Sequence, residues 1–232
     1  MVNNIWIRRA YILSMVGCIQ FIVLTFIAML FYRGGTQIDP NTSGYMFFYN
    51  FFSDLGLTIN YSGESNTISF ILFFISISFI GLSYIPFFLT ISSTFQNNDI
   101  ERKMSIACSI IGVFSSVMFI GIAFTPENVF SDIHSLFVFS AFFLAFIASL
   151  ILAYLTYFNK NYSIIFPLGY MIFSSLIVIY GLIGLLFFNN YTTEGIFIRV
   201  TTQKVVIYYL MICFFFQNYG YLKKIRHTNT ST

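Results

Sequence analysis

Residues 135–158 have the sequence SLFVFSAFFLAFIASLILAYLTYF, which contains no charged side chain. A helix needs about 20 mostly apolar residues to cross the roughly 30 Å hydrocarbon core of a bilayer. This stretch meets that length, and its apolar residues follow one another without the period-two alternation of a transmembrane β-strand. We therefore expect it to form a transmembrane helix.

Five further stretches of the same kind lie before and after it. Each is bounded by charged or turn-forming residues, and the six predicted spans are 10–32, 68–92, 104–125, 135–158, 165–188 and 204–222. Helices satisfy their own backbone hydrogen bonds inside lipid. The expected fold is an all-α, polytopic transmembrane bundle of six helices, which forms one domain over residues 1–232.

The composition of the chain also indicates a lipid environment. Of its 232 residues, 58% are hydrophobic and 8% are charged, whereas a soluble domain carries about 25% charged residues. The net charge of +3 is too small to favour nucleic acid as a partner. The cysteines lie inside apolar runs without the spacing of a metal motif. We expect no nucleic-acid partner, no metal and no cofactor.

The basic residues predict how the bundle is oriented in the membrane. With the N-terminus inside, eight of the 11 Lys and Arg residues fall on the cytoplasmic side, and the remaining three are Arg33, Arg199 and Lys204. Both termini are therefore expected in the cytoplasm. The composition suits a plasma membrane and an endomembrane equally.

The longest predicted loop, residues 33–67, is expected on the extracytoplasmic side. Its centre, residues 45–52 (YMFFYNFF), is rich in aromatic side chains that are poorly suited to water. Two arrangements remain open. The segment can lie at the level of the lipid headgroups, where aromatic rings are favoured, or it can fold back over the bundle as a lid.

Polar residues gather at the span ends on this same side. The candidate binding cluster consists of Asn50, Ser53, Asp54, Asp132, His134, Gln203 and Lys204. Because unpaired charges are costly near lipid, we expect Asp54 and Asp132 to pair with Lys204 and His134. Such a cluster is suited to bind a lipid headgroup, an ion or a protein partner.

Each of these residues also has a purely structural alternative. Asp132 can cap the span that follows it, and His134 can be a first-turn residue at the interface. Lys204 can extend toward headgroup phosphates. Residues 54–56 can form a turn that depends on Gly56.

The motif residues resemble those of a known family. The pattern Asn50-x-x-Ser53-Asp54-Leu55-Gly56 with Asn66, Asp132-x-His134-Ser135, and Gln203-Lys204 is similar to a six-span membrane family catalogued as domain of unknown function nine-nine-eight. More distantly, it resembles the damage-regulated autophagy modulators and GPI-anchor remodelling membrane proteins. The resemblance implies a bundle with these residues clustered at the extracytoplasmic face, and it implies no particular activity.

A looser likeness connects the chain to membrane hydrolases of the alkaline ceramidase and progestin–adiponectin receptor type. The likeness implies a Ser, an Asp and three histidines around zinc. This sequence matches the Ser53-Asp54 pair and at most one histidine, His134. The missing histidines place zinc hydrolysis in doubt.

Three functions follow from these observations. The first is a non-enzymatic multi-pass membrane protein whose partners are membrane lipids or another protein. The second is a membrane-embedded lipid hydrolase with Asp54, His134 and Asp132 around a metal or a water molecule. The third is a proton-coupled transporter of small solutes, which is the weakest because the spans contain almost no charge.

Overall fold

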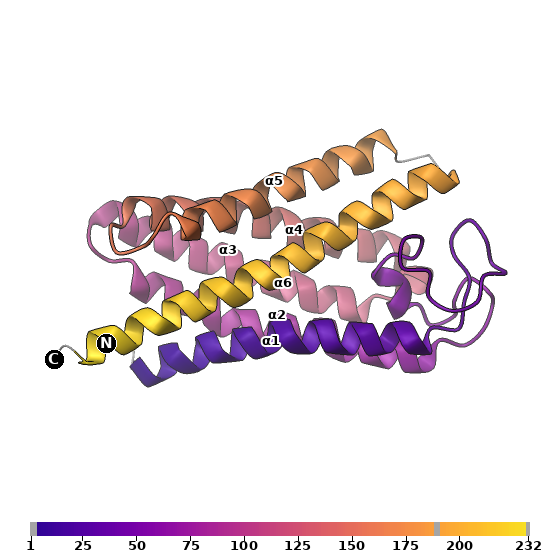
Figure 1. Cartoon of the computed structure of the whole chain (residues 1–232), viewed down its shortest axis with the longest axis horizontal. Coiled ribbons are helices and arrows are strands. Elements are labelled where there is room, and N and C mark those ends of the chain that lie inside the picture. The colour runs from indigo at the N-terminus through magenta and orange to yellow at the C-terminus, as the bar shows by residue number, and fades with distance from the viewer. Residues whose placement is uncertain (1–3, 188–190, 231–232) are drawn as a thin grey trace.

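Six long helices build the chain in the computed structural model, which describes residues 4–187 and 191–230. They are α1 (Asn4–Phe31), α2 (Thr67–Thr94), α3 (Asp99–Phe124), α4 (Glu127–Phe158), α5 (Ile165–Leu186) and α6 (Thr193–Thr230), with a short 3-10 helix η1 (Ser53–Gly56) before α2 (Figure 1). All six long helices are long and apolar enough to cross a membrane. The predicted fold class, an all-α bundle of six membrane-spanning helices, is confirmed.

Each predicted span overlaps one of these helices almost completely, although Tyr32, Thr125 and Phe187 lie just beyond the helix ends and several helices begin before the predicted spans. α4 begins at Glu127 and contains a kink at Phe130 (φ −131°, ψ 50°). α6 begins at Thr193, well before the predicted span 204–222. Its first turns are polar, which lowers their hydropathy, but polar residues still form helical hydrogen bonds. Residue 188, the last of the predicted fifth span, lies outside the described residues.

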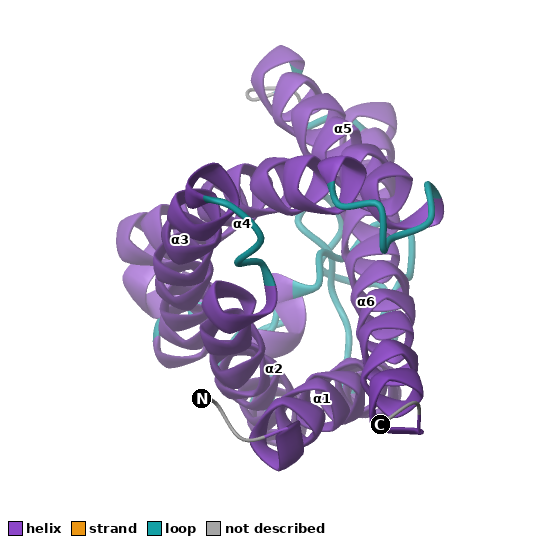
Figure 2. Cartoon of the chain, turned by 90° about the vertical axis from the view of Figure 1, so that its left-hand side faces the viewer, coloured by secondary structure: helices purple, strands orange, loops and turns teal. Residues whose placement is uncertain are grey.

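The helices form a closed ring. Each packs against the helix before it and the helix after it in the chain, and α6 returns to pack against α1. Figure 2 shows this ring along its axis. α1 begins and α6 ends at the same end of the bundle, which we call the terminal end (Figure 1). The long segment between α1 and α2 and the α3–α4 connection lie at the opposite end, which we call the loop end.

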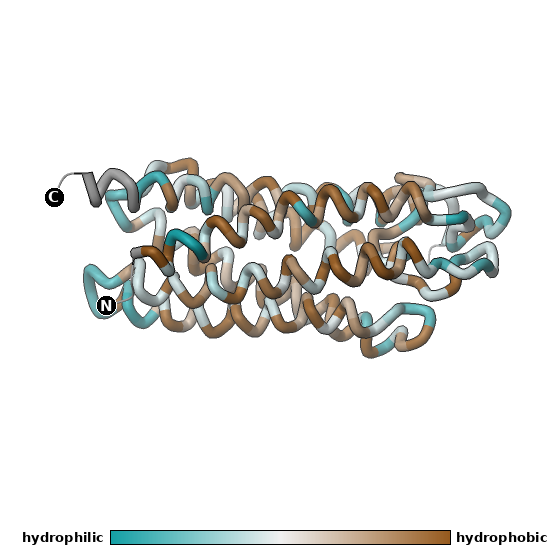
Figure 3. Tube along the Cα trace, turned by 90° about the horizontal axis from the view of Figure 1, so that it is seen from below, coloured by the Kyte–Doolittle hydropathy of each residue, from teal (hydrophilic) through white to brown (hydrophobic). Residues whose placement is uncertain are grey.

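Hydrophobic residues cover most of the length of the bundle, and hydrophilic residues gather mainly at its two ends (Figure 3). Large apolar side chains are exposed along the outside of the helices, among them Leu182 and Leu185 on α5. Side chains of this kind are suited to lipid rather than to water. The fold and its surface define an integral membrane protein of the multi-pass class.

The terminal half of the ring is filled by aromatic rings, and we call it the aromatic half. Its central rings are all buried and come from α1, α2 and α6: Tyr11, Tyr84, Phe87, Phe214 and Tyr221. Tyr84 stacks on Phe214 with 4.7 Å between ring centroids. Tyr11 stacks on Tyr221 at 5.4 Å, which joins the first helix to the last.

Candidate functional site

The aromatic segment at residues 45–52 folds back over the loop end. The Phe52 ring lies 5.9 Å from Phe21 on α1 and 5.5 Å from Tyr208 on α6. Phe48 contacts Phe197, also on α6, at 5.7 Å. Of the two arrangements that the sequence left open, the structure has the one in which this segment covers the bundle. We call residues 45–57 the lid.

Asp54 is fully buried at the base of the lid. One carboxylate oxygen, Oδ2, accepts hydrogen bonds from Asn50 Nδ2 at 3.0 Å and from the Phe51 backbone N–H at 2.9 Å. Burial raises the pKa of Asp54 from 3.8 to about 7, and the negative charge of Glu127 adds to this. The two hydrogen bonds and the charge of Lys204 act in the opposite direction.

Lys204 on α6 holds the lid from the other side. Its side chain is buried, and its ammonium donates a hydrogen bond to the backbone carbonyl of Asn50. The ammonium also faces three lid rings, with Nζ 5.0 Å from the centroid of Phe47, 5.3 Å from Tyr45 and 5.4 Å from Phe52. Cation–π attraction is strongest in such desolvated surroundings.

The predicted ion pairs are not formed. Among the described residues, neither Asp54 nor Asp132 makes a salt bridge with Lys204 or His134. Asn50 lies between the two buried charges instead, with its side chain on Asp54 and its carbonyl on Lys204. The prediction was wrong because a backbone carbonyl and three aromatic rings satisfy the ammonium without a carboxylate.

Gln203, the neighbour of Lys204, completes this attachment. Its Oε1 accepts a hydrogen bond from the Phe52 backbone N–H at 2.9 Å. The structure therefore brings together four residues of the predicted cluster, Asn50, Asp54, Gln203 and Lys204, and we call these four the latch. The latch attaches the lid to the first part of α6, at the loop end.

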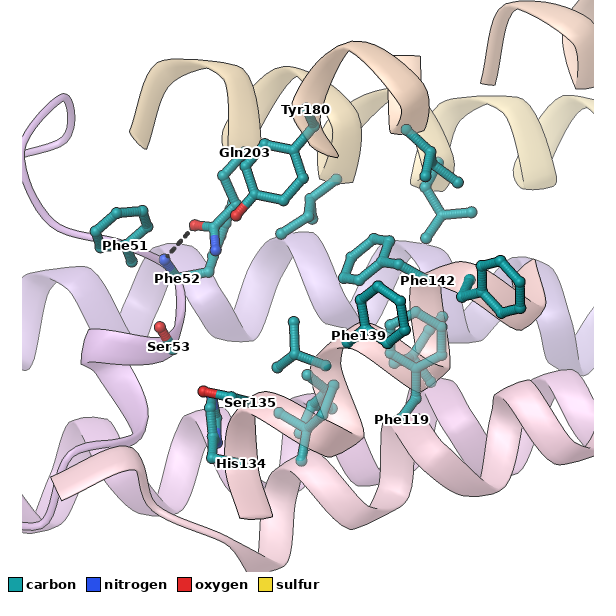
Figure 4. A pocket seen from close by; sticks show the side chains of 18 of the residues that line it. Phe51, Phe52, Ser53, Phe119, His134, Ser135, Phe139, Phe142, Tyr180 and Gln203 are labelled. Carbon is teal, nitrogen blue, oxygen red and sulfur yellow. Dashed lines mark hydrogen bonds between the residues drawn. The ribbon is translucent and has the colours of Figure 1, made fainter. Parts of the chain in front are cut away.

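A large cavity lies beneath the lid, inside the helix ring (Figure 4). Its volume is about 560 Å³, within the range of ligand sites in proteins. All six long helices contribute to its walls, which are mostly aliphatic and aromatic. The deepest part is lined by Tyr84, Phe146 and Met211, next to the aromatic half.

The depth of the cavity matches one leaflet of a bilayer. Along α6 its lining runs from Arg199 to Met211, 12 residues apart, and a helix rises 1.5 Å per residue, which gives about 18 Å. Along α4 the lining begins at Glu127, before the kink, and its part after the kink, from His134 to Phe146, covers the same number of residues. Half of a hydrocarbon core is about 15 Å.

Polar side chains line the cavity at the loop end, beneath the lid. They are Gln37, Ser53, Glu127, His134, Ser135, Arg199 and Gln203. Ser53 and Ser135 lie across from each other, and the Tyr180 hydroxyl points toward Gln203 (Figure 4). The cavity is thus amphipathic, with an apolar shaft and one polar end.

Arg199 and His134 bring polar groups to the wall of the cavity. The Arg199 guanidinium lies 5.4 Å from the centroid of the Phe51 ring, and its Nη1 is buried without a hydrogen-bond partner among the described residues. His134 Nδ1 lies 2.6 Å from the carbonyl oxygen of Thr125. A carbonyl only accepts, so Nδ1 carries the proton and a neutral imidazole keeps Nε2 as an acceptor.

The cavity opens sideways between α4 and α5. Three residues that line it are also strongly exposed: Phe139 at 67%, Phe143 at 49% and Val178 at 47%. Their positions on neighbouring helices mark the place where the cavity wall reaches the outer surface of the ring. The opening faces the apolar outer surface of the bundle.

Asp132 lies outside this arrangement. It is exposed in the first turn after the kink of α4, and it is not part of the cavity lining. This position favours an acidic residue because of the helix dipole. Arg199 and Glu127 were not among the predicted cluster residues, although both line the cavity, since each resembles an ordinary charge at a helix end.

Comparisons with models of known protein families, with curated proteins and with solved structures found no match for this chain. The geometry of the lid and cavity is therefore the basis for assigning a function.

Proposed function

We propose that this membrane protein binds one lipid molecule inside its helix ring. The acyl part occupies the apolar shaft, and the headgroup lies beneath the lid. The observation that carries the proposal is the match between a shaft about 18 Å deep and one leaflet, with the charged, amide, imidazole and serine side chains of the described lining at one end.

The side opening supports a lipid ligand over a water-soluble one. A lipid can pass from the leaflet between α4 and α5, past Phe139 and Phe143, without its chain crossing water. The aromatic half closes the shaft toward the terminal end. This closure favours binding of a lipid over passage of a solute through the ring.

Hydrolysis of the bound lipid is the second function that a specific observation favours. His134 has a protonated Nδ1, and the hydroxyls of Ser53 and Ser135 line the same polar end. In the described structure, however, no hydrogen bond joins His134 to either serine, which a nucleophile and its base require. We therefore propose binding as the function and keep hydrolysis as an outcome of the test.

We further propose that the loop end is extracytoplasmic and that the termini are cytoplasmic. The excess of Lys and Arg at the terminal end supports this orientation. The lipid then comes from the extracytoplasmic leaflet. The resemblance to the six-span family of unknown function is consistent with a polar extracytoplasmic face and stays a prediction.

Glycosylation in a eukaryotic expression host tests this orientation. Asn41 belongs to an Asn-Thr-Ser sequon and is exposed at the loop end, whereas the Asn161 sequon lies at the terminal end. We expect a glycan that Asn41→Gln removes and Asn161→Gln leaves in place. A glycan on Asn161 would show that the terminal end is extracytoplasmic and would contradict the proposed orientation.

A matched pair of variants tests lipid binding. Ile77 lines the cavity, whereas Ile75 on the same helix is 47% exposed and lies outside the lining. Ile77→Trp should fill the shaft and lower the lipid occupancy measured by native mass spectrometry about tenfold, while Ile75→Trp should leave it unchanged.

Equal lipid occupancy in the two variants would contradict the proposal. The same samples, incubated with a phospholipid and analysed by chromatography, separate binding from hydrolysis. Release of a fatty acid that His134→Gln abolishes would establish the hydrolase instead.

A further inference from the structure

We infer that the lipid bound beneath the lid has a zwitterionic headgroup, whose phosphate is held by Arg199 and whose ammonium faces Glu127. This inference rests on the proposed function and specifies the ligand class of the same cavity.

Arg199 has the features of an oxyanion anchor. The carbon atom at the centre of its guanidinium lies over the ring of Phe51, 5.4 Å from the ring centroid. Nη1 is buried and has no hydrogen-bond partner among the described residues, and the Arg199 side chain lines the cavity. A buried donor without a partner is costly, and a phosphate accepts from a guanidinium in a bidentate manner. An oxyanion at this position would satisfy Arg199.

Glu127 supplies the opposite charge. It is half-buried at the start of α4 and lines the same cavity as Arg199, which comes from α6. Its carboxylate forms no salt bridge among the described residues. An ammonium group in the cavity would give this carboxylate a partner that the protein itself does not provide.

The combination of the two charges selects the headgroup. Among the described residues that line the cavity, Arg199 and Glu127 are the ones drawn from Lys, Arg, Asp and Glu. A purely anionic lipid would gain from Arg199 but would be repelled by Glu127, and a neutral diacylglycerol would leave both unpaired. A headgroup with one phosphate and one ammonium gives a partner to both of these half-buried charges.

Three lipids with identical dioleoyl chains test the inference. Delipidated full-length protein in detergent is titrated with phosphatidylethanolamine, phosphatidylglycerol or diacylglycerol, and the bound fraction is measured by native mass spectrometry. We expect the wild-type protein to bind phosphatidylethanolamine about tenfold more tightly than either of the other two lipids. A wild-type protein that binds diacylglycerol or phosphatidylglycerol equally well would overturn the inference without any variant.

Two variants assign the roles of the charged residues. Arg199→Gln should weaken the binding of both phospholipids about tenfold and leave the binding of diacylglycerol unchanged. Glu127→Gln should remove the preference for phosphatidylethanolamine over phosphatidylglycerol. Arg33→Gln is the control, because Arg33 is exposed at the same end and lies outside the cavity lining.

These outcomes separate the two proposals. If Arg199→Gln changes all three lipids equally or none of them, the headgroup inference fails, whatever the result for Ile77→Trp. If Ile77→Trp does not reduce the binding of any lipid, the proposal that the cavity binds lipid fails, and the headgroup inference fails with it.

Discussion

Both halves of the helix ring contain aromatic side chains between α1 and α6, and yet the aromatic half is filled whereas the half at the loop end holds the cavity. In the aromatic half, α1 and α6 touch directly, through the Tyr11–Tyr221 stack and a 3.1 Å hydrogen bond from Asn218 to Ser14. At the loop end, Phe52 of the lid lies between these two helices. The cavity lies below this ring, which is part of its lining. Because aromatic rings connect α1 and α6 in both halves, the presence of aromatic residues does not by itself determine which half is hollow.

The largest expected effect tests the packing of the aromatic half. Phe87 is fully buried there, whereas Phe139 lines the cavity opening and is 67% exposed. Phe87→Ala should lower the free energy of unfolding by about 3–5 kcal/mol because it leaves a void in packed surroundings. Phe139→Ala should cost about 0.5 kcal/mol. Denaturation in mixed micelles measures both free energies of unfolding. Similar decreases in the two variants would show that the two halves do not differ in packing.

The next effect concerns the latch. Lys204→Met removes the cation from its three rings and from the Asn50 carbonyl. We expect lid opening to become easier by about 2 kcal/mol, which raises amide hydrogen exchange at Phe52 roughly 30-fold. Lys103→Met, at an exposed position on α3, is the control. Unchanged exchange at Phe52 would mean that Lys204 does not hold the lid.

A smaller effect should appear as a dependence of lid stability on pH. The pKa of Asp54 is raised from 3.8 to about 7 by burial, so the folded lid binds a proton more tightly than the unfolded segment does. The stabilisation from Asp54 is complete below about pH 4 and is lost as the pH rises to about 7. The protection factor of the lid amides, which is the intrinsic exchange rate at each pH divided by the observed rate, should therefore fall over this range. Asp54→Asn should remove this fall, and a pH dependence of the protection factor that persists in this variant would point to another group.

The smallest effect is expected at Asp132. Its side chain is exposed and lies outside the cavity and the latch. Asp132→Asn should change the free energy of unfolding by less than about 0.5 kcal/mol, with lipid occupancy unchanged. A marked loss of bound lipid in this variant would show that Asp132 contributes to lipid binding despite its position outside the cavity.

The sequence was sufficient for the spans, because apolar length is a local property of each segment. It also indicated that Asn50, Asp54, Gln203 and Lys204 belong together, since buried polar groups near lipid seek partners. The actual partner of Lys204 was not predictable, because a backbone carbonyl leaves no mark in the sequence. The cavity was not predictable either, since it is lined by residues of helices that are far apart in the chain.

The contact between α1 and α6 has a consequence for the synthesis of the protein. α1 is synthesised before the other five helices and α6 after them, and Asn218 and Tyr221, which reach α1, lie on α6. The helix ring can therefore close only after α6 has been synthesised. A nascent chain that stops before residue 193 has five of the described helices and an open wall, so a guest can be enclosed only once α6 is in place.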